Sequence, residues 1–348
     1  MLKGVKIASV IAAAALALAG CGSSSEGTDT SAAPTAATSS VKVGMAYDQD
    51  GKGDGSFNDA AYAGLSKAES DLGVEIKEVN SGSSATDASR EELLTLLATD
   101  GYNPVIAVGF AYSTALAATA AKFPDTTFAI VDSVVDAPNV GSLVFAAEQG
   151  SYLTGVIAAS ASKSGHIGFI GGMEIDLIKA FEAGYVQGAQ SVNPDIKIDS
   201  KYMGAAGDNT AWNVPDKAKA ASAAMISNGA DVIYAAAGGS GLGMFQAVKE
   251  AGEGYWAIGV DSDQYNVPAL AEYKDFILTS MLKRVDVAVY DVIKAVVDGM
   301  PLTGVQNFDL SKDGVGYATS NSAVSEYTAA ADAAAADIKA GTITVNTK

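Results

Sequence analysis

The sequence is poor in the residues that carry metal, redox and nucleic-acid chemistry. Its 348 residues include one cysteine and one histidine. A single cysteine excludes an internal disulfide framework, and a single histidine argues against a multi-histidine metal site or histidine-based catalysis. Basic residues are also scarce, because 22 Lys and Arg face 40 Asp and Glu, a net charge of -18. We therefore expect no nucleic-acid partner, since no basic cluster offsets this charge.

Sustained hydrophobicity is limited near the start of the chain to a run from Ile7 to Ala19, preceded by two lysines. The run is too short to anchor a helix in a bilayer and is typical of a signal peptide. It ends in Leu18-Ala19-Gly20-Cys21, which resembles the bacterial lipobox. That resemblance implies cleavage before Cys21 and attachment of a diacylglyceryl group to its thiol. A small buried cysteine is the alternative. We expect a lipoprotein signal peptide over residues 1–20.

The next segment, residues 22–40, consists of Gly, Ser, Thr and Ala with one proline and two acids. Nothing in it can pack into a core, so residues 21–40 are predicted to form a flexible acylated tether. A lipid at one end and a folded body at the other place the protein at the outer face of the bacterial cytoplasmic membrane.

From Val41 onward the pattern is that of an α/β protein. The chain is 49% hydrophobic, and short β-branched runs alternate with amphipathic helical segments. One predicted helix repeats Ala61, Leu65, Ala68 and Leu72 on a single face. Strand–helix–strand alternation favours parallel sheets covered on both faces. The expected strands form two series: 41–47, 74–79, 105–109, 128–132 and 141–145, then 166–171, 196–202, 232–236, 256–260 and 276–279.

Two such series predict two similar domains joined by short crossings, and ligands of such folds bind at the carboxyl ends of the strands. Chemistry-bearing residues gather there. Asp48 opens a glycine-rich loop that leads to a capping-box-like helix start, Ser56 to Asp59, which places Phe57 and Asn58 in the first helical turn. The other strand-end residues are Phe110, Tyr112, Asp132, Gly171 to Met173, Trp212, Gly238 to Gly243, Asp261 and Lys283. Singly each is a turn or cap residue; together they indicate a binding site.

The same residues argue against other chemistries. The glycine-rich stretches lack the spacing of phosphate-binding loops, and His166 begins a strand without a Ser or Cys partner. Clustered carboxylates could serve acid/base catalysis. With aromatics and one lysine, they suit better a neutral polyhydroxylated ring compound, with or without a heteroaromatic base, because acids accept from hydroxyls and aromatics stack on rings.

At this point the chain resembles the basic membrane protein (Bmp/PnrA-like) lipoproteins, the purine-nucleoside-binding components of ABC transporters. The resemblance covers residues 41 to 310 and rests on ordered segments: 54–58, 108–110, 128–132, 168–172, 237–243, 258–264 and 279–283. It implies a type I periplasmic-binding-protein fold, with two Rossmann-like lobes joined by a three-segment hinge. The expected lobes are 41–145 plus 284–306, and 146–283 plus 307–348.

The resemblance also implies roles for individual residues. Phe57 would stack on the purine, and Asp48, Asn58 and Asp132 would bind polar edges of the ligand, mostly the base. The pentose hydroxyls would fall to Asp261 and Lys283, with backbone donors from the Gly238 and Gly239 loop. Trp212 is the first choice for an opposing aromatic and Tyr234 the second. The first loop, Gly51 to Gly55, departs from the acid-rich family version and leaves the base preference open.

We therefore expect a monomeric substrate-binding protein that is not an enzyme, requires no cofactor and no metal, and delivers adenosine, guanosine or inosine to ABC permease and ATPase subunits. A receptor for a free sugar or a furanone signal on the same fold is the alternative in the same class. A nucleoside-hydrolysing enzyme and a ligand sensor for a signalling kinase are the alternatives from other classes.

Overall fold

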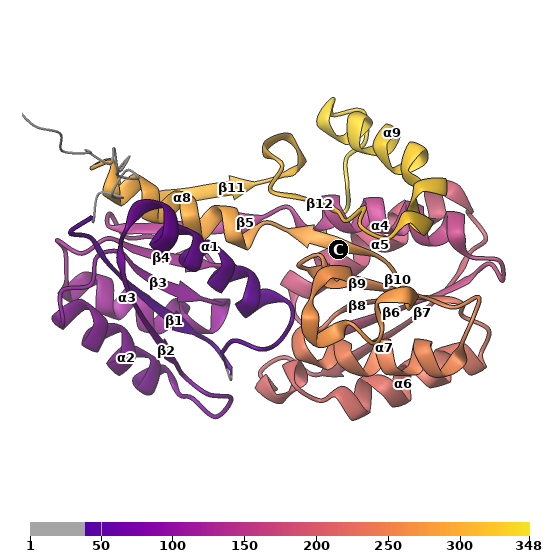
Figure 1. Cartoon of the computed structure of the whole chain (residues 1–348), viewed down its shortest axis with the longest axis horizontal. Helices are drawn as coiled ribbons and strands as arrows, with labels where there is room; N and C mark the ends of the chain where they lie inside the picture. Colours follow the sequence, from indigo (N-terminus) through magenta and orange to yellow (C-terminus); the bar gives the residue numbers. More distant parts are fainter. Residues whose placement is uncertain (1–38, 50) are drawn as a thin grey trace, which may run out of the picture. The chain divides into compact units, whose positions relative to one another are not determined.

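The computed structural model describes residues 39–49 and 51–348. The expected signal peptide, Cys21 and nearly all of the tether lie outside these residues. Among the helices of the described chain, none combines the length and apolar character that a membrane crossing requires. The described strands form two six-stranded sheets, each flanked by helices (Figure 1).

The first sheet has the order β11-β5-β4-β3-β1-β2, and all of its pairings are parallel. Five of its strands lie where the sequence predicts them. β1, β3, β4 and β5 are mostly buried, as expected of strands covered on both faces, whereas β2 at the sheet edge is only half-buried. The sixth, β11, is exposed and gives no periodic signal. The bounds are β1 Lys42–Tyr47, β2 Glu75–Asn80, β3 Val105–Val108, β4 Phe128–Val131, β5 Val140–Phe145 and β11 Gly304–Phe308.

The second sheet repeats the same arrangement, β12-β10-β9-β8-β6-β7, with only the β10–β12 pair antiparallel among the described strands. Its first five strands in the chain confirm the second predicted series. The two sheets thus share one strand order, in which the ends of the central strands form the expected ligand crevice. The bounds are β6 His166–Met173, β7 Lys197–Gly204, β8 Val232–Ala236, β9 Trp256–Asp261, β10 Ile277–Lys283 and β12 Val315–Tyr317.

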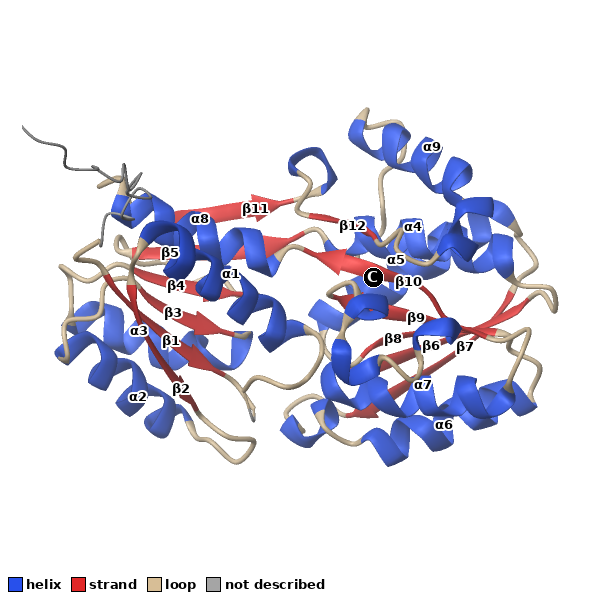
Figure 2. Cartoon of the chain, viewed as in Figure 1, coloured by secondary structure: helices blue, strands red, loops and turns tan. Residues whose placement is uncertain are grey.

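Helices cover both faces of each sheet. On the first sheet α1 and α8 pack on one face, with α2 and α3 on the other (Figure 1). On the second, α4, α5 and α9 lie opposite α6 and α7 (Figure 2). The predicted apolar face of α1 is buried in this way at Ala61, Leu65 and Ala68. The bounds are α1 Phe57–Leu72, α2 Asp87–Thr99, α3 Ser113–Lys122, α4 Ala147–Ala161, α5 Asp176–Val192, α6 Pro215–Ser227, α7 Gly241–Ala251, α8 Val285–Val297 and α9 Thr328–Lys339.

The chain passes between the two sheet–helix lobes three times: between β5 and α4, between β10 and α8, and between β11 and β12. The first and third crossings are held together, because the Phe145 and Phe308 rings stack at 5.1 Å and the Ala146 amide donates to the Phe308 carbonyl. We propose that the lobes are bounded as the sequence predicts, with one difference at the third crossing. The first lobe was expected to end at residue 306, whereas β11 pairs with β5 as far as Phe308.

Candidate ligand-binding site

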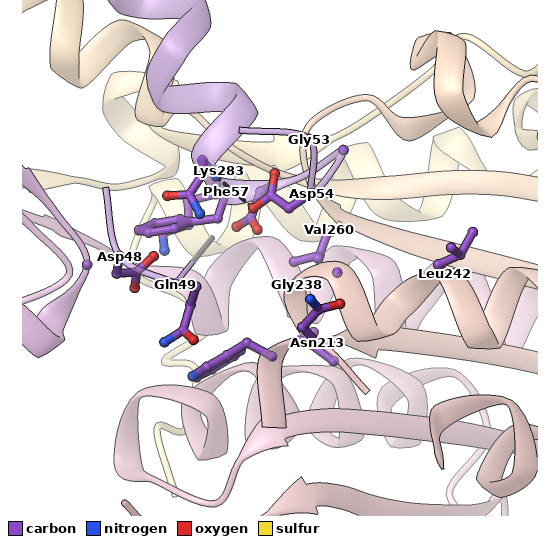
Figure 3. Close-up of a pocket in the computed structure, with 18 of the residues that line it drawn as sticks. Asp48, Gln49, Gly53, Asp54, Phe57, Asn213, Gly238, Leu242, Val260 and Lys283 are labelled. Carbon is purple, nitrogen blue, oxygen red and sulfur yellow. Dashed lines mark hydrogen bonds between the residues drawn. The ribbon is translucent and has the colours of Figure 1, made fainter. Parts of the chain in front are cut away.

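A cavity of about 310 Å³ is lined by residues from the carboxyl ends of strands in both sheets (Figure 3). This volume lies at the lower end of the range of small-molecule pockets. Asp48 follows β1, Gly109 follows β3 and Asp132 follows β4. Gly238 and Asp261 occupy the corresponding places in the second sheet. The topology thus brings many of the predicted strand-end residues to one cavity, whereas Tyr112 and Gly171 to Met173 do not line it.

The first turn of α1 places the side chains of Phe57 and Asn58 in the cavity. The Asp54 carboxylate accepts hydrogen bonds from the backbone amides of Ser56, Asn58 and Asp59. The predicted capping role of Ser56 is therefore wrong, because the Asp54 carboxylate already accepts from the first amides of the helix. The Ser56 hydroxyl instead donates to Asp261 Oδ2 of the other lobe at 2.6 Å. The placement of Phe57 and Asn58 in the first turn is confirmed.

Lys283, the last residue of β10, lies between two carboxylates from different lobes. Its ammonium forms an ion pair with Asp132, and the charge of Lys283 also acts on Asp261. The side chains of Lys283 and Asp132 are 3% and 6% exposed, so this pair is almost completely removed from water. The Lys283 ammonium also lies 4.8 Å from the centre of the Phe57 ring (Figure 3). A buried charge pair of this kind is costly to separate.

Burial shifts the carboxylates of the cavity toward their protonated forms. It raises the pKa of Asp48 to about 7, although a hydrogen bond from Asn58 acts in the opposite direction. It raises the pKa of Asp54 to about 6 against the amide bonds that Asp54 accepts. Burial also raises the pKa of Asp261, and Lys283 partly offsets this effect. The site therefore holds less negative charge than its composition suggests.

Several buried polar atoms of the cavity have no hydrogen-bond partner within the described chain. They are Asn58 Oδ1, Asp132 Oδ1 and Gln49 Oε1. Buried polar atoms are rarely left without a partner, so these three acceptors indicate a ligand that donates hydrogen bonds. In the described residues no cluster of His, Cys, Asp or Glu is suited to hold a metal ion.

Four aromatic side chains line the cavity: Phe57 and Phe110 from the first lobe, and Phe181 and Trp212 from the second. The edge of Trp212 contacts Phe110, with the ring centres 6.4 Å apart. Tyr234, the second aromatic candidate, does not line the cavity. It lies in the middle of β8 on the sheet face that α4 and α5 cover, where it is fully buried against Phe169 and bonds Ser151 at 3.2 Å. The structure therefore corrects the prediction that Tyr234 contacts the ligand.

All other predicted ligand-binding residues line the cavity: Asp48, Phe57, Asn58, Asp132, Trp212, Gly238, Gly239, Asp261 and Lys283. Sequence reasoning missed Gln49 and Asn213, although each directly follows a residue that it selected. It also missed the apolar wall from α5 and α7, formed by Leu177, Ile178, Phe181 and Leu242. Helix-face periodicity assigns such residues to a core, so no local signal separates them from ordinary packing.

Residues 41–348 match the model of the ABC transporter substrate-binding proteins of the PnrA-like (Bmp) type. The chain belongs to this family. It is 37% identical to the ABC transporter nucleoside-binding protein BmpA of Lactococcus lactis, over 89% of this chain and 90% of that protein. It is 36% identical to an uncharacterized lipoprotein of Pyrococcus horikoshii, over 80% of this chain and 69% of that protein.

Solved structures agree with this assignment. An ABC transporter solute-binding protein of Aeropyrum pernix superposes with a TM-score of 0.77 at 27% identity, covering 88% of this chain and 94% of the other. A solute-binding protein of Conexibacter woesei superposes with a TM-score of 0.69 at 20% identity, covering 88% and 99%, and supports the fold alone. The family and the two-lobe α/β fold make the chain a substrate-binding protein of an ABC transporter.

Proposed function

We propose that this chain is the lipid-anchored substrate-binding protein of an ABC importer for purine nucleosides, including adenosine, guanosine and inosine. The observation that carries the proposal is a small cavity in which aromatic rings from both lobes, Phe57 and Trp212 among them, accompany buried, unpartnered acceptors. A relative that covers nearly the whole chain is named as nucleoside-binding, which supports the same ligand class.

In this proposal the two ends of a nucleoside bind different parts of the cavity. Phe57 and Trp212 stack on the base, and Asp48, Asn58 and Asp132 bind its polar edges. Stacking on an aromatic side chain is worth about 1–3 kcal/mol per base. Asp261 and Lys283 bind the ribose hydroxyls together with the Gly238–Gly239 backbone, and each bond to a charged group adds roughly 1.5–3 kcal/mol before the costs of binding.

The decisive experiment is calorimetric titration of protein that has been unfolded and refolded to remove any co-purified ligand. Adenosine, guanosine and inosine should release heat, whereas ribose alone and the free bases should bind much more weakly. Asp261→Ala should weaken nucleoside binding at least tenfold without unfolding the chain. No heat from any nucleoside would refute the proposal, and ribose binding that is indifferent to the base would favour the sugar-receptor alternative. Free base and sugar after incubation would indicate hydrolysis.

The lipid anchor and the partners form the second part of the proposal. Cys21 carries the acyl chains and holds the protein at the outer face of the cytoplasmic membrane as a monomer, where it meets the permease and ATPase subunits. Cells fed labelled palmitate should incorporate the label into the wild-type protein. Cys21→Ala should lose both the label and the membrane association. A variant that remained labelled would remove Cys21 from this role.

A further inference from the structure

Gln49, the residue after Asp48, is the least explained polar side chain of the cavity. It is 9% exposed, and its Oε1 atom is buried without a partner in the described chain. Its side chain has no hydrogen bond to another described residue. Figure 3 shows the amide extending from the strand end into the space between Asp48 and Asn213. The amide is therefore directed into the cavity.

The position of Gln49 is costly in two ways. Its φ of 48° lies in the left-handed region, which is uncommon for residues other than glycine. A buried amide oxygen without a partner adds a desolvation cost. No contact within the described protein compensates for either cost. The fold does not require them either, because glycine could make the same turn and an apolar side chain could line the cavity. The geometry is consistent with a side chain that obtains its partner from the ligand.

An amide offers both a donor and an acceptor at every pH, whereas a carboxyl group such as that of Asp48 donates only while it holds its proton. The amide presents one donor and one acceptor side by side, and a 180° rotation exchanges them. An ionised carboxylate only accepts. The polar edge of a 6-amino purine offers an N6–H donor beside the N1 acceptor, whereas that of a 6-oxo purine offers the O6 acceptor beside an N1–H donor. One glutamine amide can therefore form a two-bond contact with either edge, by rotating.

On the basis of the proposed function, we infer that Gln49 is a specificity-determining residue that binds the six-position edge of the base and lets one cavity accept both 6-amino and 6-oxo nucleosides. The other polar residues near the base hold it in place, and Gln49 adapts to its hydrogen-bond polarity.

The test is a binding cycle with three ligands: adenosine, inosine and purine riboside, which has hydrogen at the six position. Wild-type protein should bind adenosine and inosine at least fivefold more tightly than purine riboside. Gln49→Leu should bring all three affinities within about twofold of one another. Gln246→Leu, a substitution of the same kind on α7 outside the cavity, should keep the wild-type ratios.

A second variant distinguishes the loss of a ligand contact from a folding defect. Gln49→Gly removes the amide and relieves the left-handed backbone, so the ligand-free protein should melt no lower than wild type while the six-position preference is lost. Wild-type ratios in both variants, or a wild-type protein that binds purine riboside as tightly as adenosine, would overturn the inference alone. A wild-type protein that binds none of the three would overturn the proposed function as well.

Discussion

Two aspartates show how individual residues build the site. Asp132 directly follows β4 and Asp261 is the last residue of β9, and these two strands hold the same place in their sheets. Both have left-handed backbones, with φ of 65° and 64°. Aspartate tolerates this conformation better than most residues, and it turns each carboxylate toward the cavity. Lys283 pairs with one aspartate and offsets the charge of the other. The repeated strand order thus places one aspartate at the equivalent strand end of each lobe, and the charge of Lys283 stabilises both carboxylates.

The raised pKa of Asp48 predicts a dependence of stability on pH. In the folded protein Asp48 keeps its proton up to a pH of about 7, whereas the unfolded chain releases it near the ordinary pKa of 3.8. The wild type therefore loses stability at this site as the pH rises from about 4 to 7. Asp48→Asn cannot titrate there. The stability of the variant relative to wild type should increase over this window, by at most about 4 kcal/mol.

Urea unfolding of the ligand-free wild type and of Asp48→Asn at several pH values measures this difference. Asp54 and Asp261 titrate in both proteins, so their contributions cancel to first order. Stability curves that stay parallel from about pH 4 to 7 would show that Asp48 is ionised normally in the folded state.

The two aromatic candidates of the second lobe predict opposite phenotypes. Trp212→Ala should weaken nucleoside binding by roughly 5- to 150-fold, since a stacked base is worth about 1–3 kcal/mol. Tyr234→Phe should leave the affinity unchanged and lower stability by about 1 kcal/mol, because it removes the buried bond to Ser151. Titration and thermal unfolding of both variants separate the roles. A loss of affinity in Tyr234→Phe would contradict the placement of this ring in the core.

At the scale of elements, close helix packing depends on glycine. An added Cβ at Gly188 of α5 would lie 2.0 Å from the carbonyl oxygen of Tyr152 in α4, a contact that neither helix backbone can relieve without moving. An added Cβ at Gly241, at the start of α7, would lie 3.8 Å from the Cβ of Ala235, an ordinary contact. In a free helix alanine is better than glycine by about 1 kcal/mol, whereas overpacking costs about 1–3 kcal/mol.

Gly188→Ala should therefore lower the melting temperature, and Gly241→Ala should leave it unchanged or raise it. Calorimetric scans of both variants check the opposite signs. Equal shifts for the two substitutions would mean that the α4–α5 contact relaxes more easily than its backbone geometry suggests.

The elements also show how far sequence reasoning reaches. The strands with buried β-branched runs were predictable, because parallel sheets covered on both faces leave a strong pattern. The edge strands β2 and β7 were also predicted, but β11 and β12 were not, since β11 holds one β-branched residue and β12 spans Val315–Tyr317 only. The residues at the carboxyl ends of the predicted strands were enough to locate the binding site. The direction of Tyr234 and the turn at Gln49 were beyond prediction, because they depend on register and on tertiary placement of the backbone.

At the scale of the whole described chain, the two lobes are joined across the cavity by a short set of hydrogen bonds. Ser56 Oγ donates to Asp261, Ser262 Oγ donates to the Ser56 carbonyl at 3.1 Å, and Gln264 Nε2 donates to the Gly55 carbonyl at 2.9 Å. We name the segments Gly55–Ser56 and Asp261–Gln264 the clasp. The clasp joins the glycine-rich loop of one lobe to the end of β9 in the other, so it stabilises the arrangement in which both walls of the cavity meet.

Gln264 offers the sharpest test of the clasp, because it is 3% exposed and does not line the cavity. Its Oε1 accepts from the Val260 amide within its own lobe, and its Nε2 bonds the other lobe. Gln264→Glu keeps the first bond and, once ionised, sets an acceptor against the Gly55 carbonyl. Ligand affinity should fall at least tenfold while the ratio between nucleosides stays at the wild-type value, since a smaller fraction of the protein is competent to bind.

The loss should grow from about pH 5 to pH 8, because a protonated carboxyl group can still donate the bond to Gly55 and an ionised one cannot. Gln246→Glu on α7 adds the same charge to the same lobe away from the clasp and should bind as wild type does. Calorimetry gives the affinities, and small-angle scattering of the ligand-free proteins should show Gln264→Glu to be more expanded than wild type, whereas saturation with ligand should restore the wild-type dimensions. Affinity within twofold of wild type at pH 8, or a changed preference among nucleosides, would mean that the clasp does not control closure. Loss of a closure contact outside the cavity must weaken the binding of every nucleoside by the same factor.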